Sequence, residues 1–274
     1  MKLLTTRVDV KGRLDTVDVD LYADTHFGSK SVDEELLRYH ISETKREGRM
    51  WLFLGDGIEG ITPKDYRRWN PDNVTDWAWR ALKEKRLIEA EWEYWGKMFE
   101  PIAPQCIAAL NGDGKHNVYH DVADCMGNVM RKLRITSNIQ LLYHTFAISR
   151  MGGTTMASHF VFHHGYFAGR TSGSKINNLE RSLSYFPEAL GFFCGHGHTK
   201  VQTQPITGIV KRGGKGASIY KRGAMTGSYL RTYAEDTTGY GEVKLYPPVA
   251  LGRITMRLAP FHPRDQHKFE IYNI

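Results

Sequence analysis

TVDVDLYADTHFGS, residues 16–29, opens with partly alternating apolar residues and ends in a polar cluster. The alternation over 16–23 predicts a strand. Ser31 and Glu34 form a capping-box pair, which predicts a helix from there to about residue 47. The apolar run 51–54, followed by glycine, is typical of a buried strand. The order strand, helix, strand indicates a right-handed βαβ unit and therefore an α/β fold.

The rest of the chain continues this alternation and then changes character. Apolar residues recur at three- and four-residue steps over 75–99, which predicts one long helix with a tryptophan-rich core stripe; a base-stacking surface is the alternative. Gly, Thr, Tyr and Val dominate the final eighty residues, which indicates strands. We expect a single domain over 1–274 with a β-rich portion from about 200. Further predicted elements are strands at 107–110, 140–149, 154–163 and 190–194, and helices at 121–133 and 174–186.

Composition is ordinary for a soluble globular chain of 274 residues, with 41% hydrophobic and 24% charged residues. The three cysteines have no CxxC spacing, so neither a disulfide framework nor a zinc ribbon is indicated. No apolar run reaches the ~20 residues of a membrane span. These features predict a soluble, cytoplasmic protein without a membrane partner.

Positive charge is concentrated in one part of the chain. The formal net charge is +7, and no acidic residue lies between Glu188 and Glu235, where seven lysines and arginines occur. Such a stretch favours a polyanionic partner such as nucleic acid, because cations neutralise phosphates. A solvated basic loop without a partner is the alternative.

Metal-ligand residue types follow five predicted strands. In an extended segment, residues two apart point the same way, so the paired side chains of one segment can reach one ion. Sites in α/β sheets form beyond the carboxyl ends of strands. The segments are DTH with Asp24 and His26, GDG with Asp56, NGDGKH with Asn111, Asp113 and His116, HHG with His163 and His164, and GHGH with His196 and His198.

A mixed set of carboxylates and imidazoles suits Mn²⁺, Fe or Zn²⁺ rather than Ca²⁺. Each segment is weak evidence alone, because a lone D-x-H is frequent by chance. The ordered combination is strong, and it offers enough ligands for two divalent ions that share one carboxylate. We expect two such ions, with Mn²⁺ favoured.

The order D-x-H, G-D, G-N-H, H-G, G-H-x-H resembles the five blocks of the calcineurin-like metallophosphoesterase superfamily. The resemblance spans Asp24 to Thr199, and HHGYFAGRTSGSKINNLER is similar to the segment after the fourth block in phage-encoded and prokaryotic members. It implies a four-layer sandwich, with two mixed β-sheets packed face to face and flanked by helices. It also implies a dinuclear, metal-dependent phosphoesterase.

The resemblance assigns roles to residues of this chain. Asp24, His26 and His198 would hold the first metal, Asp56 would bridge both, and His164 and His196 would hold the second with a ligand from the third block. His164 is preferred to His163, the alternate, because the family ligand directly precedes glycine. Asp56 and His116 are the expected catalytic residues, with His120 as the alternate to His116.

The third block departs from the family pattern. The family has Gly-Asn-His, whereas this chain has Gly112-Asp113-Gly114-Lys115-His116, with the histidine displaced by two residues. Asp113 is the preferred ligand and Asn111 its alternate. His116 is expected to act as general acid or charge stabiliser. An added carboxylate could change metal preference or mark a weakened enzyme.

Arg170 and Lys175 are the predicted substrate contacts, with Arg67 and Arg68 as further phosphate contacts; a solvated surface role is the alternative for each. The basic stretch favours a phosphodiester, in nucleic acid or a nucleotide, as the substrate. Two other functions stay open. One is a phosphomonoesterase or protein phosphatase, and the other is a catalytically weakened protein that binds nucleic acid or a partner.

Overall fold

The computed structural model describes residues 1–113, 116, 124–151, 153–166, 169, 171–204, 206–212, 215–235, 237–264 and 267–273. Its strands are β1 Lys2–Val10, β2 Val17–Tyr22, β3 Met50–Phe53, β4 Cys106–Ala109, β5 Leu141–Arg150, β6 Thr155–His163, β7 Gly191–Cys194, β8 Val201–Gln202, β9 Ile206–Arg212, β10 Lys215–Met225, β11 Ile254–Leu258 and β12 Phe269–Tyr272. Its α-helices are α1 Glu34–Arg46, α2 Asp76–Lys83, α3 Leu87–Phe99, α4 Cys125–Lys132, α5 Ser172–Ser184 and α6 Tyr240–Val243. Two 3-10 turns span Pro71–Asn73 and Glu100–Gln105.

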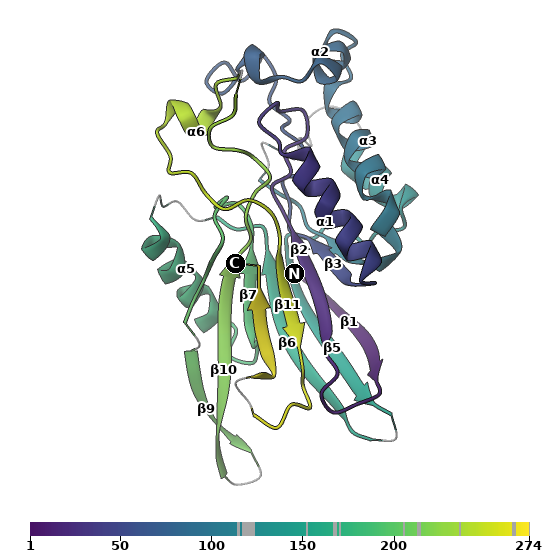
Figure 1. Ribbon diagram of the computed structural model, residues 1–274, viewed down its shortest axis with the longest axis vertical. Coiled ribbons are helices and arrows are strands. Elements are labelled where there is room, and N and C mark those ends of the chain that lie inside the picture. The colour runs from purple at the N-terminus through teal and green to yellow at the C-terminus, as the bar shows by residue number, and fades with distance from the viewer. Residues whose placement is uncertain are drawn as a thin grey trace.

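The strands form two mixed sheets (Figure 1). The smaller has the order β12-β11-β2-β3-β4, in which β2, β3 and β4 run parallel. The larger has the order β1-β5-β6-β7-β10-β8, with β9 paired to β10. In it β6, β7 and β10 run parallel. The predicted strand–helix–strand unit is present as β2, α1 and β3.

The two sheets share one apolar core. Side chains of β2, β3 and β11 in the smaller sheet pack with side chains of β5, β6 and β7 in the larger, as the joint cluster of Leu21, Leu52, Met256, Phe146 and Phe162 shows. Exposure alternates along β5, so that every second residue faces this core. The sheets therefore lie face to face.

Helices cover the outer faces of the sheets. Trp92, Trp95 and Phe99 of α3 pack with α1, α4 and the outer side chains of β2 and β3. This confirms that the tryptophan stripe of α3 is core. Leu179 and Leu183 of α5 pack on the outer face of the larger sheet. The protein is thus an α/β protein with two mixed sheets between helices (Figure 1).

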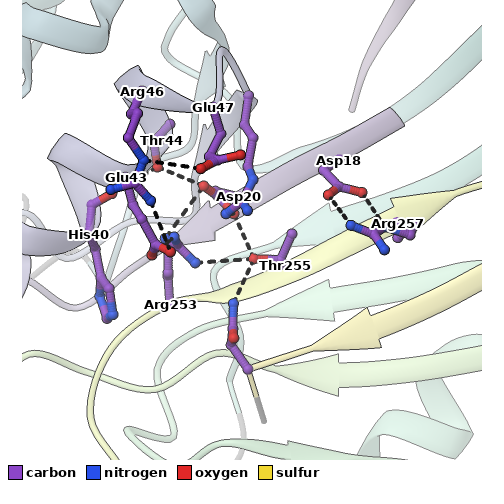
Figure 2. Close-up of polar contacts among 12 residues, drawn as sticks. Asp18, Asp20, His40, Glu43, Thr44, Arg46, Glu47, Arg253, Thr255 and Arg257 are labelled. Carbon is purple, nitrogen blue, oxygen red and sulfur yellow. Dashed lines mark hydrogen bonds and ion pairs between the residues drawn. The ribbon is translucent and has the colours of Figure 1, made fainter. Parts of the chain in front are cut away.

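A buried polar network joins α1 to the smaller sheet (Figure 2). Arg253, 1% exposed, donates to Glu43 Oε2 at 2.6 Å and to Thr255 Oγ1 at 3.1 Å. Both oxygens of Asp20 accept hydrogen bonds of 2.6 Å, one from Thr255 and one from Thr44. Because a buried carboxylate without partners would be costly, this network fixes how the helix lies on the sheet.

Two local predictions need correction, and one strand was not predicted. The single helix expected over 75–99 is two helices, because the chain turns at Lys85, whose φ is +60°. The N-cap of α1 is Asp33, whose side chain accepts from Leu36 N, while Ser31 instead donates to Asn73. Strand β1, which the sequence did not suggest, pairs in parallel with β5.

The C-terminal part of the chain is β-rich. After residue 200 the described residues form β8 to β12 and the short helix α6, with β8 to β10 in the larger sheet and β11 and β12 in the smaller. Within the described ranges, no helix combines the length and apolar character that crossing a bilayer requires.

Candidate metal centre

Four chain segments bring their polar side chains together at the carboxyl ends of strands from both sheets. Asp24 and His26 follow β2, and Asp56 follows β3. His164 follows β6, and His196 and His198 follow β7. The candidate ligands of both sheets therefore lie close together at one end of the sheets.

Asp24, His26 and His198 form the first candidate ligand group. The Nε2 atoms of His26 and His198 lie 3.2 Å apart. Asp24 Oδ1 lies 3.4 Å from His198 Nε2 and 3.9 Å from His26 Nε2. Asp24 and His26 are buried, and His198 is partly exposed. Three ligand atoms thus lie close enough together to bind one ion, and one of the three side chains is partly exposed.

Asp56, His164 and His196 form the second group. His164 Nε2 lies 3.1 Å from Asp56 Oδ2 and 3.3 Å from His196 Nδ1. His164 Nδ1 donates to Leu54 O at 2.8 Å. Since a carbonyl can only accept, this bond fixes the tautomer and leaves Nε2 free for a metal.

The two groups are neighbours. The backbone N–H of His196, in the second group, donates to Asp24 Oδ2 of the first at 2.9 Å. A Cβ on Gly195 would lie 2.7 Å from the same Asp24 oxygen. The turn after β7 must therefore approach Asp24 with a residue that has no side chain.

The backbone is strained at the ligands. Asp24, His26, Asp56, His196 and His198 all have φ between 43° and 65°, in the left-handed region. Non-glycine residues rarely adopt this conformation, which costs of order 1–3 kcal/mol each. Half of the ten described non-glycine residues with positive φ are candidate ligands. Strain concentrated in this way is typical of a functional site.

Without a metal, the charges of the second group are balanced within the protein. Burial alone would lower the pKa of His164, but the Asp56 carboxylate outweighs it and raises that pKa to about 9. Burial would raise the pKa of Asp56, but the imidazole of His164 outweighs it and lowers that pKa below its ordinary value. An ion here would have to displace the proton from His164.

The residues fit divalent metals. Two nitrogens bound to one ion at about 2.0–2.1 Å lie roughly 3.0–3.4 Å apart at ordinary coordination angles. The two imidazole pairs, at 3.2 and 3.3 Å, already have this spacing. Two histidines with one carboxylate in each group suit a transition metal.

For the third-block ligand, the surroundings of the two candidates favour the alternate over the preferred prediction. Asp113 belongs to none of the three described groups of metal-binding side chains. Its backbone N–H donates to Asp56 Oδ1 at 2.7 Å. The alternate, Asn111, is 5% exposed, and its Oδ1 finds no hydrogen-bond partner among the described residues. We therefore favour Asn111, which lies two residues after the end of β4, over Asp113.

His116 and Glu59 form a third group with His26. His116 Nδ1 donates to Glu59 O at 2.6 Å, and Glu59 Oε2 lies 3.2 Å from His26 Nδ1. Glu59 thus orients the ring of a candidate ligand. The sequence reasoning missed Glu59, although it lies three residues after Asp56, in the same segment.

The remaining predicted residues have other surroundings. His163 Nδ1 accepts from Gly165 N at 2.9 Å, so this atom braces the turn after β6. Lys175 is buried, and its ammonium donates to Gly197 O at 2.8 Å and to Thr199 Oγ1, so it braces the turn between His196 and His198 instead of facing a substrate. Arg170 and His120 lie outside the described residues.

Comparison with known proteins adds little. No family model and no curated protein matches the chain. Among solved structures, the chain is similar to GAP50, the anchor in the inner membrane complex of Plasmodium. The TM-score is 0.44, with 9% identity over 89% of this chain and 81% of that one. A score of this size does not establish a shared fold.

Proposed function

We propose that this protein is a dinuclear, metal-dependent phosphoesterase with the sandwich fold of the calcineurin-like metallophosphoesterases. One observation carries the proposal. Two neighbouring groups, each with two histidines and a carboxylate, come from strand ends of both sheets and are held by strained backbone. The spacing of their ligand atoms, described above, supports a pair of divalent ions.

Each residue has a defined part in this proposal. Asp24, His26 and His198 would hold the first ion, and His164, His196 and Asn111 would hold the second. Asp56 would be shared between the ions, because its charge acts on His26 of the first group and on His164 of the second. When bound, two such ions would supply hydroxide near neutral pH and offset the charge of phosphate oxygens.

In this proposal, His116 handles a proton at the leaving group. Burial and the neighbouring His26 lower its pKa, so the ring is neutral near pH 7. Its Nδ1–H donates to Glu59 O, so Nε2 is the ring nitrogen left for proton transfer. Nε2 must take up a proton before it can act as an acid, and a bound phosphate anion favours that protonation.

A phosphodiester is the favoured substrate, because the basic stretch between Glu188 and Glu235 suits a polyanion. The test is hydrolysis of bis-p-nitrophenyl phosphate and p-nitrophenyl phosphate with Mn²⁺, Fe²⁺ or Zn²⁺. We expect Mn²⁺-stimulated cleavage of the diester. Cleavage of the monoester alone would assign the phosphomonoesterase alternative.

Asp56→Asn is the decisive variant. We expect activity to fall at least 10³-fold, because an amide cannot bridge two cations as a carboxylate does. Asp9→Asn, an exposed aspartate on β1, is the matched control and should retain full activity. Elemental analysis should find two ions per wild-type chain. A wild-type protein that binds no transition metal and cleaves neither ester would refute the proposal and leave the binding-protein alternative.

A further inference from the structure

Large aromatic side chains are usually buried in the core, but those on the loop after Asp56 and on α2 are exposed. Tyr66 is 77% exposed and Trp79 is 37% exposed. Basic side chains alternate with them, and Lys64, Arg67 and Arg80 are also exposed. We call these five residues, together with Trp69, the aromatic–basic surface.

The rings of this surface are arranged in pairs with defined geometry. The guanidinium of Arg67 lies 5.7 Å from the centre of the Tyr66 ring. The rings of Trp69 and Trp79 lie 5.7 Å apart, tilted by 34°. Trp79 thus meets Trp69 across the loop, whereas Trp92 and Trp95 are buried in the core. Flat apolar faces and cations are therefore presented together to solvent.

The loop is fixed and adjoins the candidate metal centre. Arg68 pairs with Asp65, and Asn70 Nδ2 donates to Thr238 O at 2.6 Å. Arg68 and Trp69 line a cavity of about 20 Å³ together with Glu59, whose carboxylate lies 3.2 Å from His26. Trp69 of the aromatic–basic surface therefore shares a cavity with Glu59, a residue that lies against the first ligand group.

Single-stranded nucleic acid combines the two chemistries that this surface matches. Unpaired bases offer π-faces that stack on Tyr and Trp, and the phosphates pair with Arg and Lys. A duplex hides its base faces, and a small anion would not use the rings. We propose that the aromatic–basic surface binds single-stranded nucleic acid and guides it to the neighbouring candidate metal centre. Binding does not depend on the proposed function; only cleavage of the bound strand rests on it.

Binding is tested by fluorescence anisotropy of labelled dT15 and of a 15-base-pair duplex, in EDTA so that no cleavage occurs. We expect dT15 to bind at least tenfold more tightly than the duplex. The double variant Tyr66→Ala/Trp79→Ala should raise the Kd for dT15 at least tenfold, since each stacked base contributes a factor of about 5–150. Tyr39→Ala/Tyr185→Ala removes two exposed tyrosines elsewhere and is the matched control.

A charge variant keeps the test independent of packing. Arg67→Glu/Arg80→Glu should weaken dT15 binding and reduce the slope of log K against log salt by about 1.4, or ~0.7 per phosphate contact. Tighter binding of the duplex, or equal weakening by the test and control pairs, would overturn the proposal, as would an unchanged salt slope.

The two proposals fail separately. If dT15 binds no more tightly than the duplex but the diester is hydrolysed, the binding-surface proposal fails and the phosphoesterase proposal stands. If dT15 binds selectively but neither ester is hydrolysed in the metal-loaded assay, the binding-surface proposal stands and the phosphoesterase proposal fails. Repeating the titration with rU15 shows whether the sugar is read, and binding of neither strand overturns the surface.

Discussion

Lys175 shows how a single residue can serve a site without facing it. Its ammonium donates to Gly197 O and to Thr199 Oγ1, on either side of His198. His196 and His198 both hold left-handed backbone conformations, which a free turn would not keep. Burial lowers the pKa of Lys175. Its hydrogen bond to Gly197 O stabilises the turn that carries His196 and His198. It therefore positions two candidate metal ligands at once.

Replacing this lysine should weaken metal binding more than folding. We expect Lys175→Met to lower the affinity for Mn²⁺ about tenfold, the range found for residues that orient metal ligands. Activity measured against metal concentration reports this shift, and activity at saturating Mn²⁺ should largely return. Lys132→Met, an exposed lysine on α4, is the control. An unaltered metal titration in a folded Lys175→Met protein would contradict this role.

At the scale of elements, the junction between α2 and α3 explains a wrong prediction. Lys85 N donates to Leu82 O, and Arg86 N donates to Ala81 O. These bonds form a Schellman motif, in which the residue after the C-cap is usually glycine because its φ is positive. Here that residue is a lysine with φ +60°. The apolar period continues through it, so the sequence pattern showed no break.

Lys85→Gly should therefore stabilise the protein. Glycine adopts positive φ without strain, so we expect the free energy of unfolding to rise by about 0.5–1 kcal/mol. Lys85→Ala keeps the strain while removing the same charge, and it should change stability little. Urea denaturation of the three proteins measures the difference. A Lys85→Gly protein no more stable than Lys85→Ala would show that the turn is unstrained.

Prediction from sequence succeeded where the determinants were local. The strand-end segments and their paired histidines were predictable because a short apolar run and a glycine mark each strand end. The sequence favours Asp113 over Asn111 because of its spacing from Gly112, whereas proximity to β4 and burial favour Asn111. Glu59 was missed because its role depends on where His26 lies after folding. Strand β1 was missed because its exposed face makes the apolar alternation weak.

At the scale of the whole molecule, the site requires the two sheets to stay in register, because each contributes ligands. His144, on β5, lies fully buried in the face that packs against the smaller sheet. Neither ring nitrogen has a hydrogen-bond partner among the described residues. Burial lowers the pKa of His144 to about 4. Its protonation would place an unpaired charge between the sheets.

Acid should therefore open the sandwich through His144. The pKa is about 4 when folded and about 6.5 when unfolded, so the unfolded chain binds the proton more readily. The stability contribution is fully present above pH 6.5 and is lost as the pH falls towards 4. His144→Leu removes this dependence. The free energy of unfolding of His144→Leu minus that of the wild type should increase by about 2 kcal/mol as the pH falls from 7 to 4.5.

The matched control is His159→Leu on the adjacent strand β6. His159 lies on the other face, where its Nδ1 meets Thr145 Oγ1 at 3.0 Å. Denaturation curves of the three metal-free proteins at several pH values separate the two histidines, and the metal-binding capacity after return to pH 7 reports whether the sheets re-form the site. If the His144→Leu and wild-type curves stay parallel down to pH 4.5, protonation at this position does not drive the separation, and the acid sensitivity lies with other groups.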